Sequence, residues 1–166
     1  MAVRSQRNNN PGNVRSGEWE GKIGIDNADG GPFVIFATPE HGVRSMVKTL
    51  YTYQSRHGIR TIREIISRWA PSEENDTEGY INFISKETGI NPDQPLDLRN
   101  DSETMRKITN AMIRKEGGNS ALNYFSPHIV AGIEMANGTR TTPSSSRPNF
   151  TPLPGLGNPD ALLDQA

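Results

Sequence analysis

The stretch at residues 101–119, DSETMRKITNAMIRKEGGN, decides the expected fold. Asp101 or Ser102 is a typical helix N-cap, because a short polar side chain there can accept a hydrogen bond from a free backbone N–H. The pair Gly117–Gly118 is typical of a helix end, since glycine adopts the backbone conformations that stop a helix without a β-carbon penalty. The sequence therefore predicts one long helix that ends at the two glycines.

Apolar residues form a single stripe along this helix. Met105, Ile108 and Met112 recur at spacings of three and four, and the next position on the stripe is Glu116. A carboxyl on an apolar face loses part of its hydration, which favours its protonated form, and a protonated carboxyl can act as a general acid near neutral pH. The alternative is that Glu116, at a helix end, turns out into water.

Composition divides the chain into a folded part and a tail. A length of 166 residues suits one domain, while 33% hydrophobic residues and a mean hydropathy of -0.67 are low for a chain that is folded throughout. Residues 139–166 are rich in Pro, Ser and Gly, so we expect an extended arm there and a domain at residues 1–138. Sparse apolar residues in the arm predict docking on a partner, with disorder as the alternative: Phe150, Leu153, Leu156, Leu162 and Leu163.

Charge and motif content exclude several function classes. The formal net charge of -1, from 18 Lys+Arg and 19 Asp+Glu, argues against a general nucleic-acid binder. We find no run long enough for a membrane span and no apolar signal-peptide core. The chain has no cysteine, no phosphate-binding glycine loop, no GxSxG and no HExxH, and its three histidines lack metal-ligand spacing. We therefore expect no cofactor and no metal.

The first 36 residues predict a loop followed by a β-hairpin. Residues 7–13, RNNNPGN, are dense in amides and turn formers, which indicates an ordered loop, or else a floppy terminus. Two β-prone runs, at residues 23–26 and 33–36, flank an Asn/Asp/Gly connection. Trp19 is either the anchor of this hairpin or an exposed platform for stacking on a sugar. Because an isolated hairpin is only marginally stable, we expect it to pack on a helical body.

Helical periodicity accounts for most of the remaining domain. A helix begins at residues 38–41, TPEH, and continues to Gly58, and a capping box at residues 61–64 begins another that ends at 70–71. Further helices are expected from about residue 76 to Gly89 and from 126–127 to Gly138. The predicted fold is mainly α (α+β), with a small hairpin lobe on a helical domain.

Several of these motifs together resemble one family. RNNNPGNV at 7–14, WEG at 19–21, FVIFATPEHGVRSM at 33–46, RWAPSEENDTEGYI at 68–81 and AMIRKEGG at 111–118 resemble phage virion-associated muralytic proteins. These proteins are similar to lysozyme-type lytic transglycosylases, and the resemblance covers about residues 7–138. It implies a lysozyme-like domain in a phage virion protein that is made in the host cytoplasm and acts on the host cell wall in the periplasm.

The order of the elements departs from that family. In lysozyme-like enzymes the helix that ends in the catalytic Glu comes first, and the hairpin lobe follows. In this sequence the loop and hairpin come first, and the helix that ends in Glu116 comes late. We therefore expect a circular permutation that places Glu116 at the position of the early catalytic Glu.

The resemblance also implies a substrate and a reaction. The substrate is the glycan strand of peptidoglycan, cleaved at the β-1,4 bond between N-acetylmuramic acid and N-acetylglucosamine. Glu116 would protonate the glycosidic oxygen and then act as a base on water or on the muramic C6 hydroxyl. The residues expected to bind or position the glycan or the acid are Asn10, Asn13, Trp19, Thr77 and Tyr80.

A two-carboxylate glycosidase needs a second acid, and the sequence leaves that choice open. The candidates are Glu18, Glu20 and Asp26 in the hairpin lobe. A lytic transglycosylase can use one acid together with the acetamido group of its substrate, so the absence of a partner would favour that reaction.

Two other functions remain as alternatives. The first is an inactive structural virion protein that keeps a lysozyme-like fold and contacts other virion proteins through residues 139–166. The second, weaker one is a small DNA-binding module, suggested by Arg56, Arg60, Arg63 and Arg68.

Overall fold

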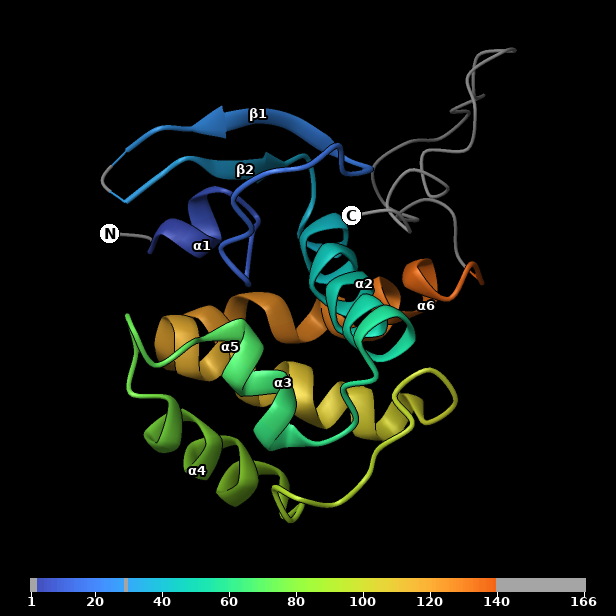
Figure 1. Cartoon of the computed structure of the whole chain (residues 1–166). Coiled ribbons are helices and arrows are strands. Elements are labelled where there is room, and N and C mark those ends of the chain that lie inside the picture. The colour runs from blue at the N-terminus through green and yellow to red at the C-terminus, as the bar shows by residue number, and fades with distance from the viewer. Residues whose placement is uncertain (1–2, 29, 140–166) are drawn as a thin grey trace.

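The computed structural model describes residues 3–28 and 30–139 as a helical body topped by a small lobe (Figure 1). The elements are, in order, α1 Arg4–Arg7, β1 Lys22–Asp26, β2 Phe33–Phe36, α2 Pro39–His57, α3 Ile62–Trp69, α4 Thr77–Thr88, α5 Ser102–Phe125, a 3₁₀ turn Ser126–His128 and α6 Ile129–Ala136. The predicted mainly helical fold with a small antiparallel hairpin is confirmed.

The lobe consists of β1, β2 and the N-terminal segment. The two strands pair antiparallel, with Ile25 opposite Val34, and the register shifts between Lys22 and Gly24. β2 is almost entirely buried, whereas Ile23 on β1 is 67% exposed, so one strand faces the molecule and the other faces solvent. The N-terminal segment differs from the prediction in one respect, because Arg7 ends a short helix and the ordered loop begins after it.

Helix ends in the body follow the predicted capping residues. The Thr38 side chain accepts a hydrogen bond from the backbone N–H of His41, Pro39 is the first residue of α2, and Gly58 ends it in the left-handed conformation. Asp76 caps α4 through its side chain, which accepts from the N–H of Gly79, and Gly89 ends the helix. These local signals are independent of tertiary packing, which explains why the sequence predicts the boundaries well.

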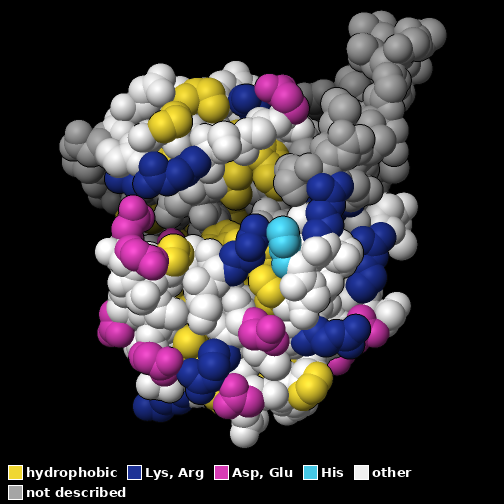
Figure 2. Space-filling model, in the orientation of Figure 1, with side chains coloured by type: hydrophobic (Ala, Val, Ile, Leu, Met, Phe, Trp, Pro, Cys, Tyr) yellow, Lys and Arg dark blue, Asp and Glu magenta, His cyan; other side chains and the backbone are white. Residues whose placement is uncertain are grey.

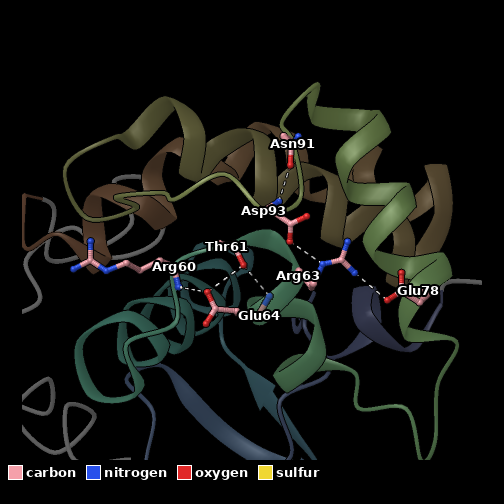
Figure 3. A network of polar contacts seen from close by, with 7 residues as sticks. All are labelled: Arg60, Thr61, Arg63, Glu64, Glu78, Asn91 and Asp93. Carbon is pink, nitrogen blue, oxygen red and sulfur yellow. Dashed lines mark hydrogen bonds and ion pairs between the residues drawn. The ribbon is translucent and has the colours of Figure 1, made fainter.

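The cap of α3 is drawn in Figure 3. The Thr61 hydroxyl oxygen accepts from the backbone N–H of Glu64 at 3.1 Å, and the Glu64 carboxylate accepts from the Thr61 hydroxyl at 3.1 Å and from the Arg60 N–H at 3.3 Å. The predicted capping pair therefore forms, although the carboxylate binds the N–H one residue ahead of the cap.

Arg63 links α3 to two neighbouring segments (Figure 3). Its Nε donates to Asp93 at 2.8 Å and its Nη1 donates to Glu78 at 3.0 Å. Pairs this exposed contribute little to stability. They do, however, neutralise one of the four arginines on which the DNA-binding alternative depends.

The core lies where α2, α3, α4, α5 and α6 meet. Met105, Ile108 and Met112 are at most 1% exposed, so the apolar stripe of α5 faces this core as predicted. Other fully buried side chains come from the neighbouring helices, among them Met46, Leu50, Ile62, Ile65, Ile66, Ile81 and Ile84. α2 packs most extensively on α6, and α4 packs on α5.

α5 is broken at Gly118. The backbone there has φ 74° and ψ −170°, which is far from helical, and a further helical segment follows to Phe125. The predicted helix end at the two glycines is therefore confirmed as a break, after which the chain continues as helix in a new direction.

The expected arm at 139–166 lies, apart from Thr139, outside the described residues. Its five apolar residues and the partner contact predicted for it lie there too. No helix in the part of the chain that the structure describes is long and apolar enough to cross a membrane.

We expect Gly118→Ala to destabilise the protein by about 1–3 kcal/mol, because its backbone conformation is open essentially to glycine alone. A β-carbon at Gly118 would meet no atom within 4 Å, so the cost is conformational rather than steric. Gly89→Ala is the control. A β-carbon there also meets no atom within 4 Å, but the backbone lies in the left-handed helical region, so the substitution should cost about 1–2 kcal/mol. Urea unfolding measures both, and an unchanged midpoint for Gly118→Ala would contradict the break.

Candidate functional site

A cleft of about 950 Å³ separates the hairpin lobe from the helices. Its lining comes from five parts of the chain: α1 and the loop after it, β2, α2, α3 with the segment that follows, and the end of the first half of α5. Figure 2 shows basic side chains on the lobe and on the helices below it. Three residues predicted for the site line this cleft, namely Asn13, Trp19 and Glu116.

Glu116 is held by Tyr80. The Tyr80 hydroxyl, from α4, donates to Oε2 of Glu116 at 2.8 Å. Tyr80 is only 5% exposed, and burial raises the pKa of its phenol, as do the nearby charge of Glu116 and the hydrogen bond to it. The phenol therefore keeps its proton and acts as a fixed donor to the carboxylate. The predicted proximity of these two residues is confirmed.

The expected desolvation of Glu116 is wrong. The residue is exposed, although it is the next position on the buried stripe after Met112. α5 breaks two residues later, so its last turn extends past the core and reaches the rim of the cleft. In the unliganded protein the acid is therefore open to water on one side and bonded to Tyr80 on the other.

Asn10 is a structural residue and not the exposed ligand-binding amide that we expected. Its side chain is fully buried, and its Nδ2 donates to the carbonyls of Val14 at 3.0 Å and Val34 at 2.9 Å. Its Oδ1 accepts from the N–H of Val14 at 2.9 Å. With its donors and acceptor used inside the chain, Asn10 joins the loop to β2.

Asn13 and Trp19 remain on the surface of the cleft. Asn13 is half-buried in a left-handed conformation, with φ 49°, at the end of the amide-rich loop. The indole Nε1 of Trp19 donates to the carbonyl of Ser16 at 2.6 Å, which fixes the ring. Trp19 is half-buried and forms part of the cleft wall, so it is not a residue of the main core.

Thr77 does not line the cleft. Its hydroxyl donates to the carbonyl of Ala70 at 2.5 Å, and this bond closes the segment between α3 and α4. The expectation that Thr77 contacts the acid or the glycan is therefore replaced by a structural role.

The three candidates for a second carboxylate lie outside the cleft lining. Glu18 pairs with Lys22 at 3.6 Å, and Glu20 lies 3.3 Å from Arg44. Burial acts to raise the pKa of Glu20, but the hydrogen bond from His41 and the charge of Arg44 outweigh it, so the pKa is lowered. The hydrogen bond from Asn8 lowers the pKa of Asp26. Among residues 3–28 and 30–139, Glu116 is the only carboxylate in the cleft wall.

Sequence reasoning missed several cleft residues. Trp69 packs partly against the core and also lines the cleft, where it lies against Gly12 so closely that a β-carbon there would come within 2.8 Å of its ring. The glycine in the amide-rich loop was the available signal, because close approach of an aromatic ring to backbone requires glycine. Arg4, Arg15 and Tyr53 also line the cleft and belong to no motif that marks a site.

Comparison with known proteins places the chain in a phage family. No protein-family profile matches it. It is 44% identical over 138 residues to protein P5 of Pseudoalteromonas phage PM2, an alignment that spans 80% of this chain and 81% of P5. The chain belongs to the family of phage PM2 protein P5. This relationship confirms the phage part of the resemblance found in the motifs. Among the described residues, no three His, Asp or Glu side chains gather closely enough to hold a metal ion.

The raised pKa of Tyr80 predicts a pH dependence of stability. The unfolded chain loses the phenolic proton from about pH 10, while the folded protein holds it to higher pH, so folding is progressively disfavoured above pH 10. The contribution is present below pH 10 and is lost above it, with a slope of up to about 1.4 kcal/mol per pH unit. We expect the wild-type free energy of unfolding to fall more steeply than that of Tyr80→Phe between pH 10 and 11. The two curves should run parallel between pH 6 and 8, and parallel curves throughout would contradict the prediction.

Proposed function

We propose that this protein is a virion-associated muralytic protein of the phage that opens the host cell wall locally during infection. Its reaction is cleavage of the β-1,4 bond between N-acetylmuramic acid and N-acetylglucosamine in a peptidoglycan strand. The observation that supports this most is the Tyr80–Glu116 hydrogen bond at the rim of a cleft of about 950 Å³. A cleft of this size accommodates a few linked sugar rings.

The geometry gives each residue a role in this proposal. Tyr80 is a positioning residue, since its bond to Oε2 leaves Oε1 of Glu116 to face a glycosidic oxygen. A glycan in the cleft would displace the water around this exposed carboxyl, so the dry surroundings expected from the sequence arise only in the complex. Trp19 and Trp69 line the cleft and supply rings on which sugars can stack, and the Nδ2 of Asn13 can donate to hydroxyl or acetamido oxygens, since its Oδ1 is buried.

The single carboxylate of the cleft favours the lytic transglycosylase reaction over two-carboxylate hydrolysis. A second acid would have to lie about 5–10 Å from the first, and none of Glu18, Glu20 and Asp26 reaches the cleft lining. Glu116 would then act first as the acid and afterwards as the base that removes the proton of the muramic C6 hydroxyl.

Contacts of α1 support a circularly permuted lysozyme-like fold. The Gln6 amide donates to the carbonyl of Ser120 at 2.8 Å and to its hydroxyl at 2.9 Å, just after the break in α5. A β-carbon at Gly117 would lie 3.1 Å from Ser5 Oγ. The segment that leads into the hairpin lobe thus begins beside the end of the Glu116 helix. A short connection there would restore the order in which the Glu helix precedes the lobe.

An inactive structural protein of the virion is the second candidate. The exposure of Glu116 favours it, because a catalytic acid is usually shielded from water. In that case residues 139–166 would provide the contacts with other virion proteins.

Zymography on peptidoglycan separates the two candidates. We expect wild type to clear the gel and Glu116→Gln to lose activity by about 10²–10⁴-fold, since the amide cannot donate a proton as an acid does. Glu103→Gln is the matched control, because Glu103 is an exposed acid in the first turn of the same helix. Clearing by Glu116→Gln at the wild-type level would remove the mechanism, and absence of clearing by folded wild type would favour the structural role.

Mass spectrometry of the released muropeptides tests the choice of reaction. We expect ends with 1,6-anhydromuramic acid, which lack one water relative to hydrolysis products, because C6 hydroxyl attack retains no external water. Reducing muramic ends from the same digestion would instead show attack by water and contradict the transglycosylase reaction. A muramidase digest supplies the reference for hydrolysis.

A further inference from the structure

Three arginines line the cleft, and they come from both of its walls. Arg4 on α1 and Arg15 on the following loop belong to the lobe, whereas Arg68 belongs to α3. Only one carboxylate, Glu116, shares the described lining with them. The cleft therefore has a local excess of positive charge in a chain whose formal net charge is -1.

Aromatic rings hold these guanidinium groups. The Cζ atom of Arg4 lies 4.3 Å from the centroid of the Phe33 ring, and that of Arg15 lies 5.0 Å from the same ring. The Cζ atom of Arg68 lies 5.3 Å from the ring centroid of Tyr53. A guanidinium that stacks on a ring contacts it with its planar face. The N–H groups of the guanidinium lie at the edge of that plane and stay available to an anion.

Several arginines elsewhere on the molecule pair with carboxylates, although Arg99 stacks on Tyr51 in the same way as the cleft arginines stack on their rings. Arg63, Arg106 and Arg114 each donate to a carboxylate of the chain at a distance of 3.0 Å or less. None of the three cleft arginines has an Asp or Glu within ion-pair distance among residues 3–28 and 30–139. Arg15 and Arg68 therefore have no carboxylate partner in this part of the chain, whereas the charge of Arg4 also helps to lower the pKa of Asp26.

We propose that Arg4, Arg15 and Arg68 bind the carboxylates of the peptide stems carried by the glycan, so that the cleft selects peptide-bearing over peptide-free strands. This inference rests on the proposed function and specifies its substrate. Arginine suits the task because its planar fork donates two parallel hydrogen bonds to a carboxylate. The placement of arginines on both walls fits a strand whose acidic branches project to either side of the sugar backbone.

A nucleic acid is the less favoured occupant of the same charges. Phosphate binders usually present an extended basic face, whereas this chain has a formal net charge of -1 and neutralises Arg63 with Asp93 and Glu78. The positive charge of the cleft is instead interleaved with Glu116, which would repel a phosphate backbone at the point where the proposed mechanism places a neutral glycosidic oxygen.

The test measures binding by the Glu116→Gln protein, which holds the ligand without turnover. Its ligands are a peptidoglycan tetrasaccharide with free peptide stems, the same tetrasaccharide after amidase has removed the stems, and a single-stranded oligonucleotide. We expect the peptide-bearing ligand to bind at least about tenfold more tightly than the stripped one, as one charge-assisted contact would provide. The double variant Arg15→Gln with Arg68→Gln should reduce this ratio to near one, because it removes two of the proposed contacts with the stem carboxylates. Both arginines are exposed, so the variant should keep its core intact.

Arg106→Gln is the matched control and should keep the ratio, since Arg106 pairs with Glu103 away from the cleft lining. Equal affinity for both tetrasaccharides, or binding of neither, would overturn the inference, as would tighter binding of the oligonucleotide that depends on Arg15 and Arg68. Zymography by the protein with Glu116 intact reports separately on the proposed function. If zymography shows clearing but the binding assay shows no preference for peptide-bearing strands, only the inference is refuted. If the binding assay shows the preference but zymography shows no clearing, only the proposed catalysis is refuted.

Discussion

The buried amide of Asn10 is the interaction on which the cleft depends. It joins the loop backbone at Val14 to the inner strand at Val34, so that loop and hairpin behave as one wall. A buried amide with all of these bonds formed is stable, whereas each bond lost would leave a backbone group unpaired in the interior. The loop residues that face the cleft, Asn13 and Arg15, are positioned by this wall. The site thus depends on a polar group that does not line the cleft.

The opposite wall depends on packing rather than on polar contacts. α2 and α3 contribute Tyr53, Arg68 and Trp69, and their inner faces belong to the same apolar core as the stripe of α5. This core fixes α4 relative to α5. The Tyr80 hydroxyl of α4 is therefore held within hydrogen-bond distance of Glu116 on α5. The position of the Tyr80 hydroxyl at Glu116 is therefore set by many apolar contacts.

Local signals in the sequence predicted the helices and strands. The predictions that failed concern the burial of site residues, which depends on tertiary contacts. Caps such as Thr38, Thr61 and Gly58 act within one helical turn, so the boundaries were predictable. The stripe of α5 predicted burial as far as Glu116, but burial ends before that residue, because its rim position depends on where the lobe ends, which no periodicity encodes. Asn10 and Asn13 are the same residue type in the same loop, and only the path of β2 decides which one is buried. The arginines of the cleft were not predicted, because residues from α1, a loop and α3 converge only after folding.

The docking of α1 beside Gly117 has a practical consequence for handling this protein. Gln6 and Ser120 are 114 positions apart in sequence, yet their side chains touch next to the turn that bears the acid. Val3 also lies near Gly117, so a fusion partner joined to this segment would crowd the turn that carries Glu116. Under the proposed function, such a partner would compete for space with the glycan strand, so the fused protein should bind the strand more weakly than the native chain.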